Sequence, residues 1–93
     1  MKQIYWEIVL PVIDQVSIIR VYLSVVSSCT DDYKWYSNQE SRSRIGWRWQ
    51  MAPSTVKYAI SQLVKKGFLR SESRGIYSVD KKYLKNEELV ETS

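Results

Sequence analysis

The segment from Pro53 to Gly67 constrains the fold of this chain more than any other segment, because it reads as one amphipathic helix with both ends marked. Its apolar residues recur at helical spacing, so they share one face that must be buried: Val56, Ile60, Leu63 and Val64. Proline suits the first position of a helix, where its missing N–H group is not needed. Glycine suits the position just past the end, where a left-handed backbone costs it little. The sequence therefore predicts a helix that begins near Pro53 and ends before Gly67.

The opposite face of this helix carries hydroxyls, an amide and cations, with no carboxylate among them: Ser54, Thr55, Lys57, Tyr58, Ser61, Gln62 and Lys65. Such side chains are suited to phosphate oxygens and to the edges of nucleic-acid bases. We expect contacts with bases from the following residues: Ser54, Thr55, Lys57, Tyr58 and Gln62.

The net charge of +4 is distributed unevenly along the chain. Residues 41–75 contain eight Lys or Arg residues and one acidic residue, Glu72, which gives this segment a net charge of +7. Residues 1–40 and 76–93 sum to −2 and −1. A basic segment inside an otherwise acidic chain is what an anionic polymer partner requires, and a solvated charged surface is the alternative interpretation.

The residues before the predicted helix indicate the fold to which it belongs. Ile45-Gly46 precedes Thr55-Val56 by ten residues, with a short turn at Gln50 and Met51 between them. This register resembles the helix-turn-helix of winged-helix DNA-binding proteins, and the matching positions are Ile45, Gly46, Thr55, Val56, Ala59, Ile60, Leu63 and Gly67.

The turn departs from that family pattern. The family usually has Gly, Val and Ser where this chain has Gln50, Met51 and Ala52. Ala52 has no hydroxyl with which to cap the following helix, so Ser54 is the alternative cap.

The resemblance covers roughly residues 16–80 and implies a winged helix-turn-helix: a mainly α fold with a small β-hairpin, the wing (α+β). Strands are expected at 68–71 and 76–79, joined by a turn at 72–75. Arg74 at the tip of the wing is placed to reach phosphates or the adjacent minor groove. The short wing resembles those of small plasmid and phage replication initiators and of bacterial and viral regulators.

A second helix is predicted from about Asn38 to Arg48 or Trp49, because Ser37 followed by Glu40 is a capping-box pattern. The first helix of a helix-turn-helix crosses the DNA backbone, so its arginines either contact phosphate or serve as solubilising surface charges. Residues expected to contact phosphate here and on the wing are Arg42, Arg44, Arg48, Ser61, Lys65, Arg70, Ser73 and Arg74.

Two tryptophans close this second helix. The family register puts a core residue where Trp49 stands, so we expect Trp49 in the core and Trp47 partly exposed. Stacking on unpaired bases is an alternative that the sequence favours less, because no period-two sheet platform accompanies these aromatics.

The N-terminal part of the chain reads less clearly. Residues 3–10 fit a strand or a helix, and Pro11 closes the segment. Asp14 is the expected N-cap of a helix that ends around Ser27 to Thr30. Its stripe is Val16, Ile19, Leu23 and Val26, widened by Ile18, Tyr22 and Val25. This broad apolar face can cover the helix-turn-helix and still leave surface for a second copy of the chain.

Size and composition predict a single domain over residues 1–93, with a core over about 14–80, an N-terminal extension over 1–13 and a tail over 81–93. The tail could form a short helix around Tyr83 to Glu91. The chain has neither an apolar run of membrane-spanning length nor a secretory-signal layout, so we expect a soluble cytoplasmic protein without a membrane partner.

The sequence has few residues from which a catalytic or metal-binding site could be formed. With Cys29 as the lone cysteine and no histidine, the sequence offers no internal disulfide, no zinc ligand set and no imidazole base. The three glycines are explained by packing, helix termination and a turn, so no phosphate-cradling loop is predicted. We therefore expect no enzyme activity, no cofactor and no metal.

The leading hypothesis is a sequence-specific binder of double-stranded DNA that acts as a homodimeric transcription regulator, with its recognition helix in the major groove. Its small size is typical of a viral or mobile-element protein. An origin-binding protein of a plasmid or phage replication system is the first alternative. The second is a winged-helix adaptor that binds a protein partner through an aromatic patch: Trp6, Tyr33, Trp35 and Trp47.

Overall fold

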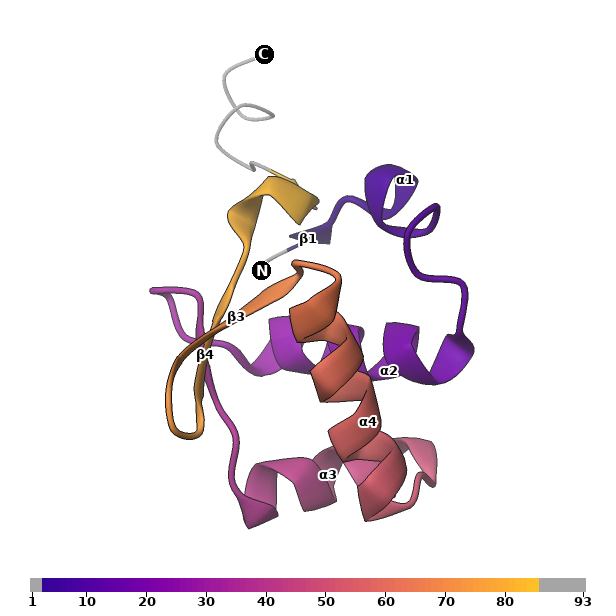
Figure 1. Ribbon diagram of the computed structural model, residues 1–93, viewed down its shortest axis with the longest axis vertical. Helices are drawn as coiled ribbons and strands as arrows, with labels where there is room; N and C mark the ends of the chain where they lie inside the picture. The colour runs from indigo at the N-terminus through magenta and orange to yellow at the C-terminus, as the bar shows by residue number, and fades with distance from the viewer. Residues whose placement is uncertain (1–2, 86–93) are drawn as a thin grey trace.

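The described residues form four α-helices and a three-stranded antiparallel sheet around one hydrophobic core (Figure 1). The computed structural model describes residues 3–85. The elements are β1 (Gln3–Ile4), α1 (Trp6–Val9), α2 (Val16–Ser28), β2 (Lys34–Tyr36), α3 (Gln39–Trp49), α4 (Pro53–Lys65), β3 (Leu69–Ser73), β4 (Ile76–Val79), the 3-10 helix η1 (Lys81–Tyr83) and β5 (Leu84–Lys85). None of the helices within this described range is long and apolar enough to cross a lipid bilayer.

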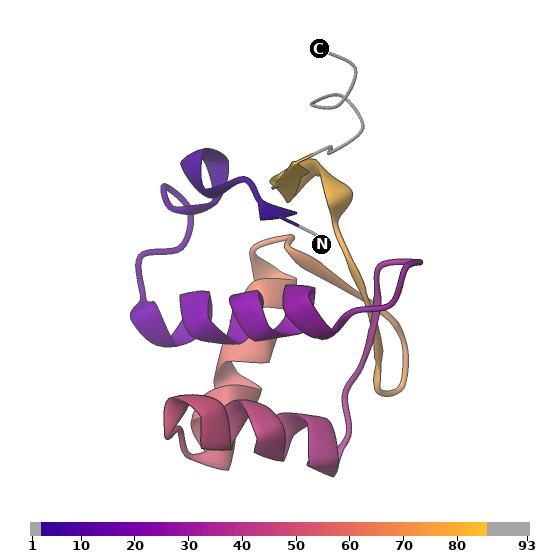
Figure 2. The ribbon, with the colours of Figure 1, turned by 180° about the vertical axis from the view of Figure 1, so that it is seen from behind.

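The helix α4 confirms the strongest prediction from the sequence. It begins at Pro53, and Gly67 beyond its end has a φ of +87°. The buried residues of α4 are Val56, Ala59, Ile60 and Leu63, whereas Val64, which was predicted to share this face, is only half-buried. The N-cap residue is Ala52 without a side-chain hydrogen bond, so the prediction that Ser54 caps this helix was wrong. Figures 1 and 2 show α4 crossing both α2 and α3.

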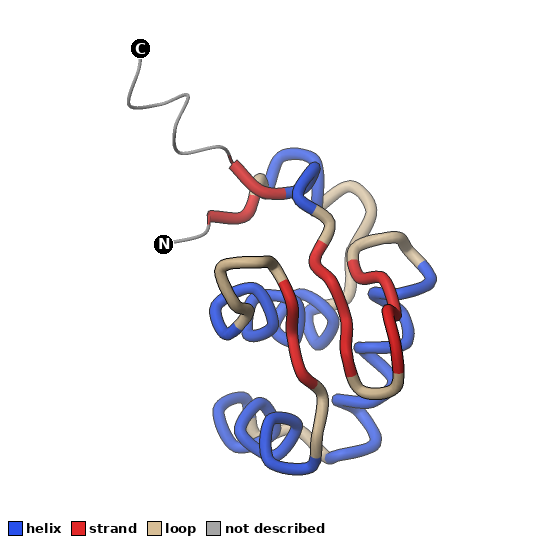
Figure 3. Tube along the Cα trace, turned by 90° about the vertical axis from the view of Figure 1, so that its left-hand side faces the viewer, coloured by secondary structure: helices blue, strands red, loops and turns tan. Residues whose placement is uncertain are grey.

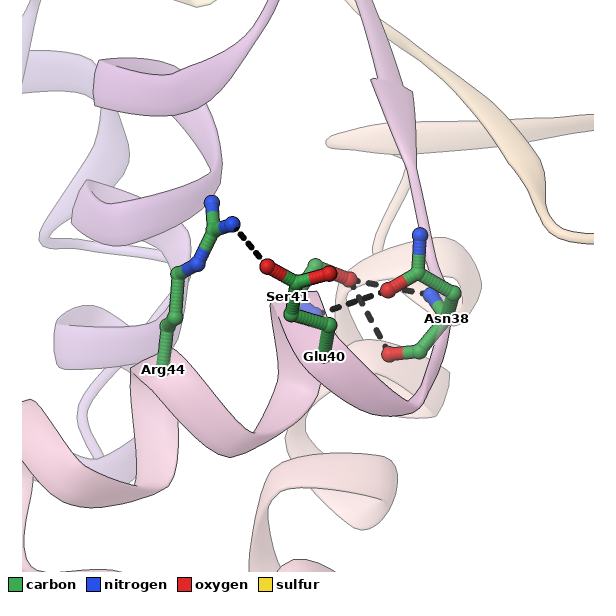
Figure 4. Close-up of polar contacts among 4 residues, drawn as sticks. All are labelled: Asn38, Glu40, Ser41 and Arg44. Atoms are coloured by element: carbon green, nitrogen blue, oxygen red, sulfur yellow. Dashed lines mark hydrogen bonds and ion pairs between the residues drawn. The ribbon is translucent and has the colours of Figure 1, made fainter.

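The start of α3 differs from the predicted capping box. Asn38 is the N-cap: its side-chain Oδ1 accepts from the N–H of Ser41 at 2.8 Å, and Ser41 Oγ accepts from the N–H of Asn38 at 2.9 Å (Figure 4). The prediction of a box from Ser37 to Glu40 was wrong, because the helix begins one residue later than that box requires. Glu40 pairs instead with Arg44.

The turn between α3 and α4 lies where the sequence predicts it. Gln50 adopts a left-handed conformation with φ +54°. The N–H of Met51 donates to the carbonyl oxygen of Gly46 at 2.8 Å. A Cβ on Gly46 would lie 2.9 Å from the carbonyl oxygen of Met51, so this close approach requires glycine.

The buried face of α2 is rotated relative to the predicted stripe. Val16 is 58% exposed, whereas the buried residues are Ile18, Val21, Tyr22, Ser24, Val25 and Val26. Apolar residues occur on most sides of this helix, so its periodicity does not define a single face. Packing against α4 and β2 selects the side that is buried. The predicted cap at Asp14 was also wrong, because Gln15 occupies the N-cap position; the end of α2 at Ser28 is as predicted.

The sheet has the strand order β2–β4–β3, and Figure 3 shows its strands side by side with helices behind them. The predicted hairpin is confirmed, but β3 extends to Ser73, so the turn at 74–75 is shorter than the predicted turn at 72–75. The strand β2 was not predicted. It contributes Trp35, which is buried at 3% exposure and packs 6.0 Å from the ring of Tyr77.

The two ends of the described chain pair with each other. β1 and β5 form a two-stranded antiparallel sheet at the end of the molecule away from α3 (Figures 1 and 2). Residues 3–10 therefore contain both a short strand and a short helix. The predicted tail helix is wrong for residues 83–85, which end η1 and form β5; residues 86–91 lie outside the described residues.

Candidate nucleic-acid interface

The exposed face of α4 is a ridge of polar side chains. Ser54, Tyr58, Ser61 and Lys65 follow one another at intervals of four, three and four residues, and all are exposed. They therefore lie opposite the buried face of the helix. Tyr58, the one aromatic residue of α4, has 51% of its surface exposed.

The remaining predicted base contacts lie on the two flanks of this ridge. Lys57 is exposed on the flank that faces α3 and the hairpin. Thr55 and Gln62 are half-buried, and helical spacing puts both on the opposite flank from Lys57. The five predicted base-contacting residues therefore do not share one face of α4: they lie on its exposed ridge and on both of its flanks.

A cavity that we call the hairpin groove separates α4 from the sheet and has a volume of about 510 Å³. It combines three cations with four hydroxyls, and its described lining residues include no carboxylate: Ser37, Arg42, Lys57, Ile60, Ser61, Val64, Lys65, Ser71 and Tyr77. Such a lining favours a phosphate group.

A second cavity, the helix groove, lies between α3 and α4 and also measures about 510 Å³. Its lining residues are Gln39, Arg42, Ser43, Gly46, Trp47, Met51, Pro53 and Lys57. Within residues 3–85, no carboxylate lines this groove either. Arg42 and Lys57 line both grooves, so they stand at the boundary between them.

Arg42 is held at this boundary by a hydrogen bond. Its Nη1 donates to Ser37 Oγ at 2.9 Å, and the side chain is half-buried. The N–H of Ser37 in turn donates to the carbonyl oxygen of Gly75 at 2.7 Å. The start of α3, its first arginine and the tip of the hairpin are therefore joined through Ser37.

The other two arginines of α3 are not brought to the grooves. Arg44 follows Arg42 by two residues, which is a rotation of about 200° around the helix, and it pairs with Glu40. The guanidinium of Arg48 lies 5.0 Å from the ring of Trp49.

Trp49 faces α2 rather than the grooves. Arg20 of α2 lies over the same ring at 5.4 Å, and Trp49 Nε1 donates to Ser24 Oγ at 2.7 Å. Trp49 packs against the core as predicted. Trp47, predicted to be partly exposed, is 85% exposed.

The hairpin divides its polar residues between its two faces. Ser71 and Tyr77 are cross-strand partners and both line the hairpin groove, whereas Arg70 pairs with Ser78 on the other face. Ser73 and Arg74 are exposed at the end of the hairpin.

Glu72, the one acidic residue of the 41–75 segment, does not oppose the cations of the grooves. Its Oε1 accepts from Ser78 Oγ at 2.7 Å and lies 3.6 Å from Lys34 Nζ. The Ser78 hydrogen bond, and then the charge of Lys34, hold the pKa of the Glu72 carboxyl below its ordinary value. The negative charge is therefore paired with β2 and β4.

Sequence reasoning missed several polar residues of the two grooves: Ser37, Gln39, Ser43, Ser71 and Tyr77. Ser71 and Tyr77 were missed because the predicted hairpin register was wrong by one residue. The predicted turn at 72–75 pairs Ser71 with Ile76 and puts Tyr77 on the other face of the hairpin, whereas in the structure Ser71 pairs with Tyr77.

The predicted aromatic patch for a protein partner is not formed. Trp35 is in the core, and Trp6 and Tyr33 pack partly against it. The helix α1, which contains Trp6, lies at the opposite end of the molecule from α3, which contains Trp47 (Figures 1 and 2).

Comparisons of the chain with protein-family models, with curated proteins and with solved structures gave no match.

Proposed function

We propose that this chain is a winged helix-turn-helix protein that binds double-stranded DNA and regulates transcription as a homodimer inside the cell. The order α2–β2–α3–α4–β3–β4 and the strand order β2–β4–β3 support this architecture. In it, α3 and α4 are the two helices of the helix-turn-helix and the β3–β4 hairpin is the wing.

The observation that carries the proposal is the pair of grooves on either side of Arg42 and Lys57, beside the exposed ridge of α4; both are lined by cations and, among the described residues, by no carboxylate. A duplex offers a groove wide enough for one helix, flanked by two lines of phosphates. With α4 in the major groove, Ser54, Tyr58 and Ser61 face base edges. The residues that contact the flanking phosphates are Arg42, Lys57, Lys65 and Arg74.

The homodimer is supported by apolar residues at the other end of the molecule. Ile8, Leu10, Val12 and Val16 are 39–58% exposed, and all four come from the N-terminal segment. Residues 3–16 contain two acidic residues and no cation, so this surface suits another protein chain and not DNA. A two-fold dimer would also double the short site that one winged helix can read.

A pair of charge-reversal variants tests the proposal. Lys57→Glu with Arg74→Glu changes two residues of the proposed DNA surface. Arg44→Glu with Arg48→Glu makes the same change in net charge on faces of α3 away from both grooves. We expect the first variant to lose roughly 10- to 100-fold or more in affinity for a selected duplex in fluorescence anisotropy, and the second to lose much less.

Equal losses in the two variants would mean that net charge alone drives binding. An unchanged affinity in the first variant would remove α4 and the hairpin from the interface. Circular dichroism spectra that match the wild type are the control for folding.

A further inference from the structure

The most exposed large apolar residue of the described chain is Trp47, and it borders the helix groove. Gln39, Ser43 and Trp47 are spaced by four residues, so they form one row along α3. Pro53 and Lys57 of α4 line the groove with them. The groove thus combines one exposed indole, an amide, a hydroxyl and two cations.

This combination matches the parts of a nucleotide. Flat bases stack on aromatic side chains, an amide and a hydroxyl can hydrogen-bond to a base edge, and the two cations can bind its phosphate. The volume of about 510 Å³ lies within the range of about 300–1,000 Å³ that is typical of small-ligand sites. A purely apolar partner would leave Arg42 and Lys57 without a counter-charge.

Only an unpaired base can use the indole in this way. Inside a duplex, each base is stacked between its neighbours, and only its edges are accessible from the grooves. A base that leaves the stack exposes its ring faces. We propose that the helix groove holds an unpaired base of the bound DNA, stacked on Trp47, with the adjoining phosphate on Arg42 and Lys57.

This inference rests on the proposed DNA binding and deepens it, because it names the form of DNA that binds best. DNA with unpaired bases beside a duplex occurs where a duplex is being opened. Such a preference favours the alternative role of an origin-binding protein over binding to a fully paired operator.

The test compares two kinds of fluorescein-labelled DNA with the full chain. One is a fully paired duplex selected from a random pool. The other is a set of the same duplex with a single unpaired thymine inserted at each successive position. We expect the wild type to bind the best bulged duplex at least about fivefold more tightly than the paired duplex, as expected for one stacked base.

Three variants assign the effect to the groove. Trp47→Ala should abolish the preference and leave the affinity for the paired duplex within about twofold of wild type, because the side chain is exposed and makes no contribution to the core. Trp47→Phe keeps a ring and should retain most of the preference. Tyr58→Ala changes an exposed aromatic of the α4 ridge outside the helix groove, so it should weaken both kinds of DNA alike.

Several results would overturn the inference while the proposed function stands. These are a wild type without preference at any bulge position, a preference that survives Trp47→Ala, and an equal loss of both affinities in Trp47→Ala. A wild type that binds neither DNA would instead reject the proposed function, and the inference with it. No effect of Trp47→Ala on either DNA would likewise overturn the inference and would leave Trp47 available to a protein partner.

Discussion

The N–H of Ser37 donates a hydrogen bond to the carbonyl oxygen of Gly75 at 2.7 Å, and this bond holds the tip of the β3–β4 hairpin against the start of α3. Ser37 also accepts a hydrogen bond from Arg42 through its hydroxyl. The position of the hairpin and the position of a groove-lining cation are therefore coupled through one residue. This coupling explains how a short hairpin can keep a fixed place beside α4.

The first prediction concerns Gly75, whose φ is +77° and where a Cβ would lie 3.1 Å from the carbonyl oxygen of Ser37. Gly75→Ala should lower the free energy of unfolding for two reasons: left-handed strain and this close contact. Gly67→Ala is the matched control, because its φ is +87° but no heavy atom of the described residues, apart from its chain neighbours, lies within 4 Å of the added Cβ. The control should cost about 1–2 kcal/mol, and Gly75→Ala should cost more. If urea denaturation gives the same loss of unfolding free energy for both variants, the contact with Ser37 is not tight.

The second prediction concerns the core. The ring of Tyr22 is fully buried, 5.2 Å from that of Phe68, and within the described residues its hydroxyl has no hydrogen-bond partner. Burial accordingly raises the pKa of Tyr22 above its ordinary value. Tyr22→Phe should leave the free energy of unfolding unchanged or raise it by about 1 kcal/mol, since it removes an unsatisfied polar group.

Tyr22→Ala is the control for the ring itself. It should lower the free energy of unfolding by about 3–5 kcal/mol, as expected for loss of a large buried aromatic. A loss above about 1 kcal/mol in Tyr22→Phe would mean that the hydroxyl is satisfied in solution, for example by a buried water molecule.

The third prediction concerns pH. The pKa of Glu72 in the folded protein is below its ordinary value of 4.5, so the charged carboxylate stabilises the fold at higher pH. This contribution is fully present above pH 4.5 and is lost as the pH falls through the lower pKa of the folded state. The difference in melting temperature between wild type and Glu72→Gln should be constant near neutral pH and should shrink toward zero as the pH falls into the acid range. A difference that widens as the pH falls would contradict the assignment.

The fourth prediction concerns oligomeric state. Leu10→Glu with Val16→Glu puts charges on the exposed apolar surface of the N-terminal segment. Sedimentation equilibrium should find the wild type as a dimer and this variant as a monomer with an unchanged circular dichroism spectrum. Trp47→Ala, at the other end of the molecule, should remain dimeric. A wild type that is monomeric at all concentrations would remove the homodimer from the proposal.

The sequence was sufficient for elements whose signals are local. The helix α4 has a single apolar stripe, a proline at its start and a glycine after its end, and the structure agrees with all three. The strand β2 has only three residues, and its pairing with β4 joins segments about 40 positions apart, so no local pattern announces it. For α2, apolar residues on most sides left the buried face to be selected by packing.

The candidate site was predictable in its composition but not in its geometry. The segment 41–75 has a net charge of +7, but a charge count does not say how a helix is turned about its axis. The orientation of α3 about its axis places Arg42 in the lining of the grooves. On other sides of the helix, Arg44 pairs with Glu40 and Arg48 lies over the ring of Trp49. Trp47 was recognised as exposed, but the groove that it borders depends on how α3 and α4 pack together.

The most direct test of DNA binding through α4 and its two grooves is the salt dependence of affinity for a selected duplex, between about 50 and 200 mM salt. Four phosphate contacts per protomer, from Arg42, Lys57, Lys65 and Arg74, predict a slope of log K against log salt of about −3.6 for one bound protomer and about −7 for the proposed homodimer. These slopes are losses of roughly 100-fold and roughly 10⁴-fold over this range. Lys57→Glu with Arg74→Glu should make the slope shallower by about two per protomer. Absence of binding at 50 mM salt, or a slope that this variant leaves unchanged, would contradict the account.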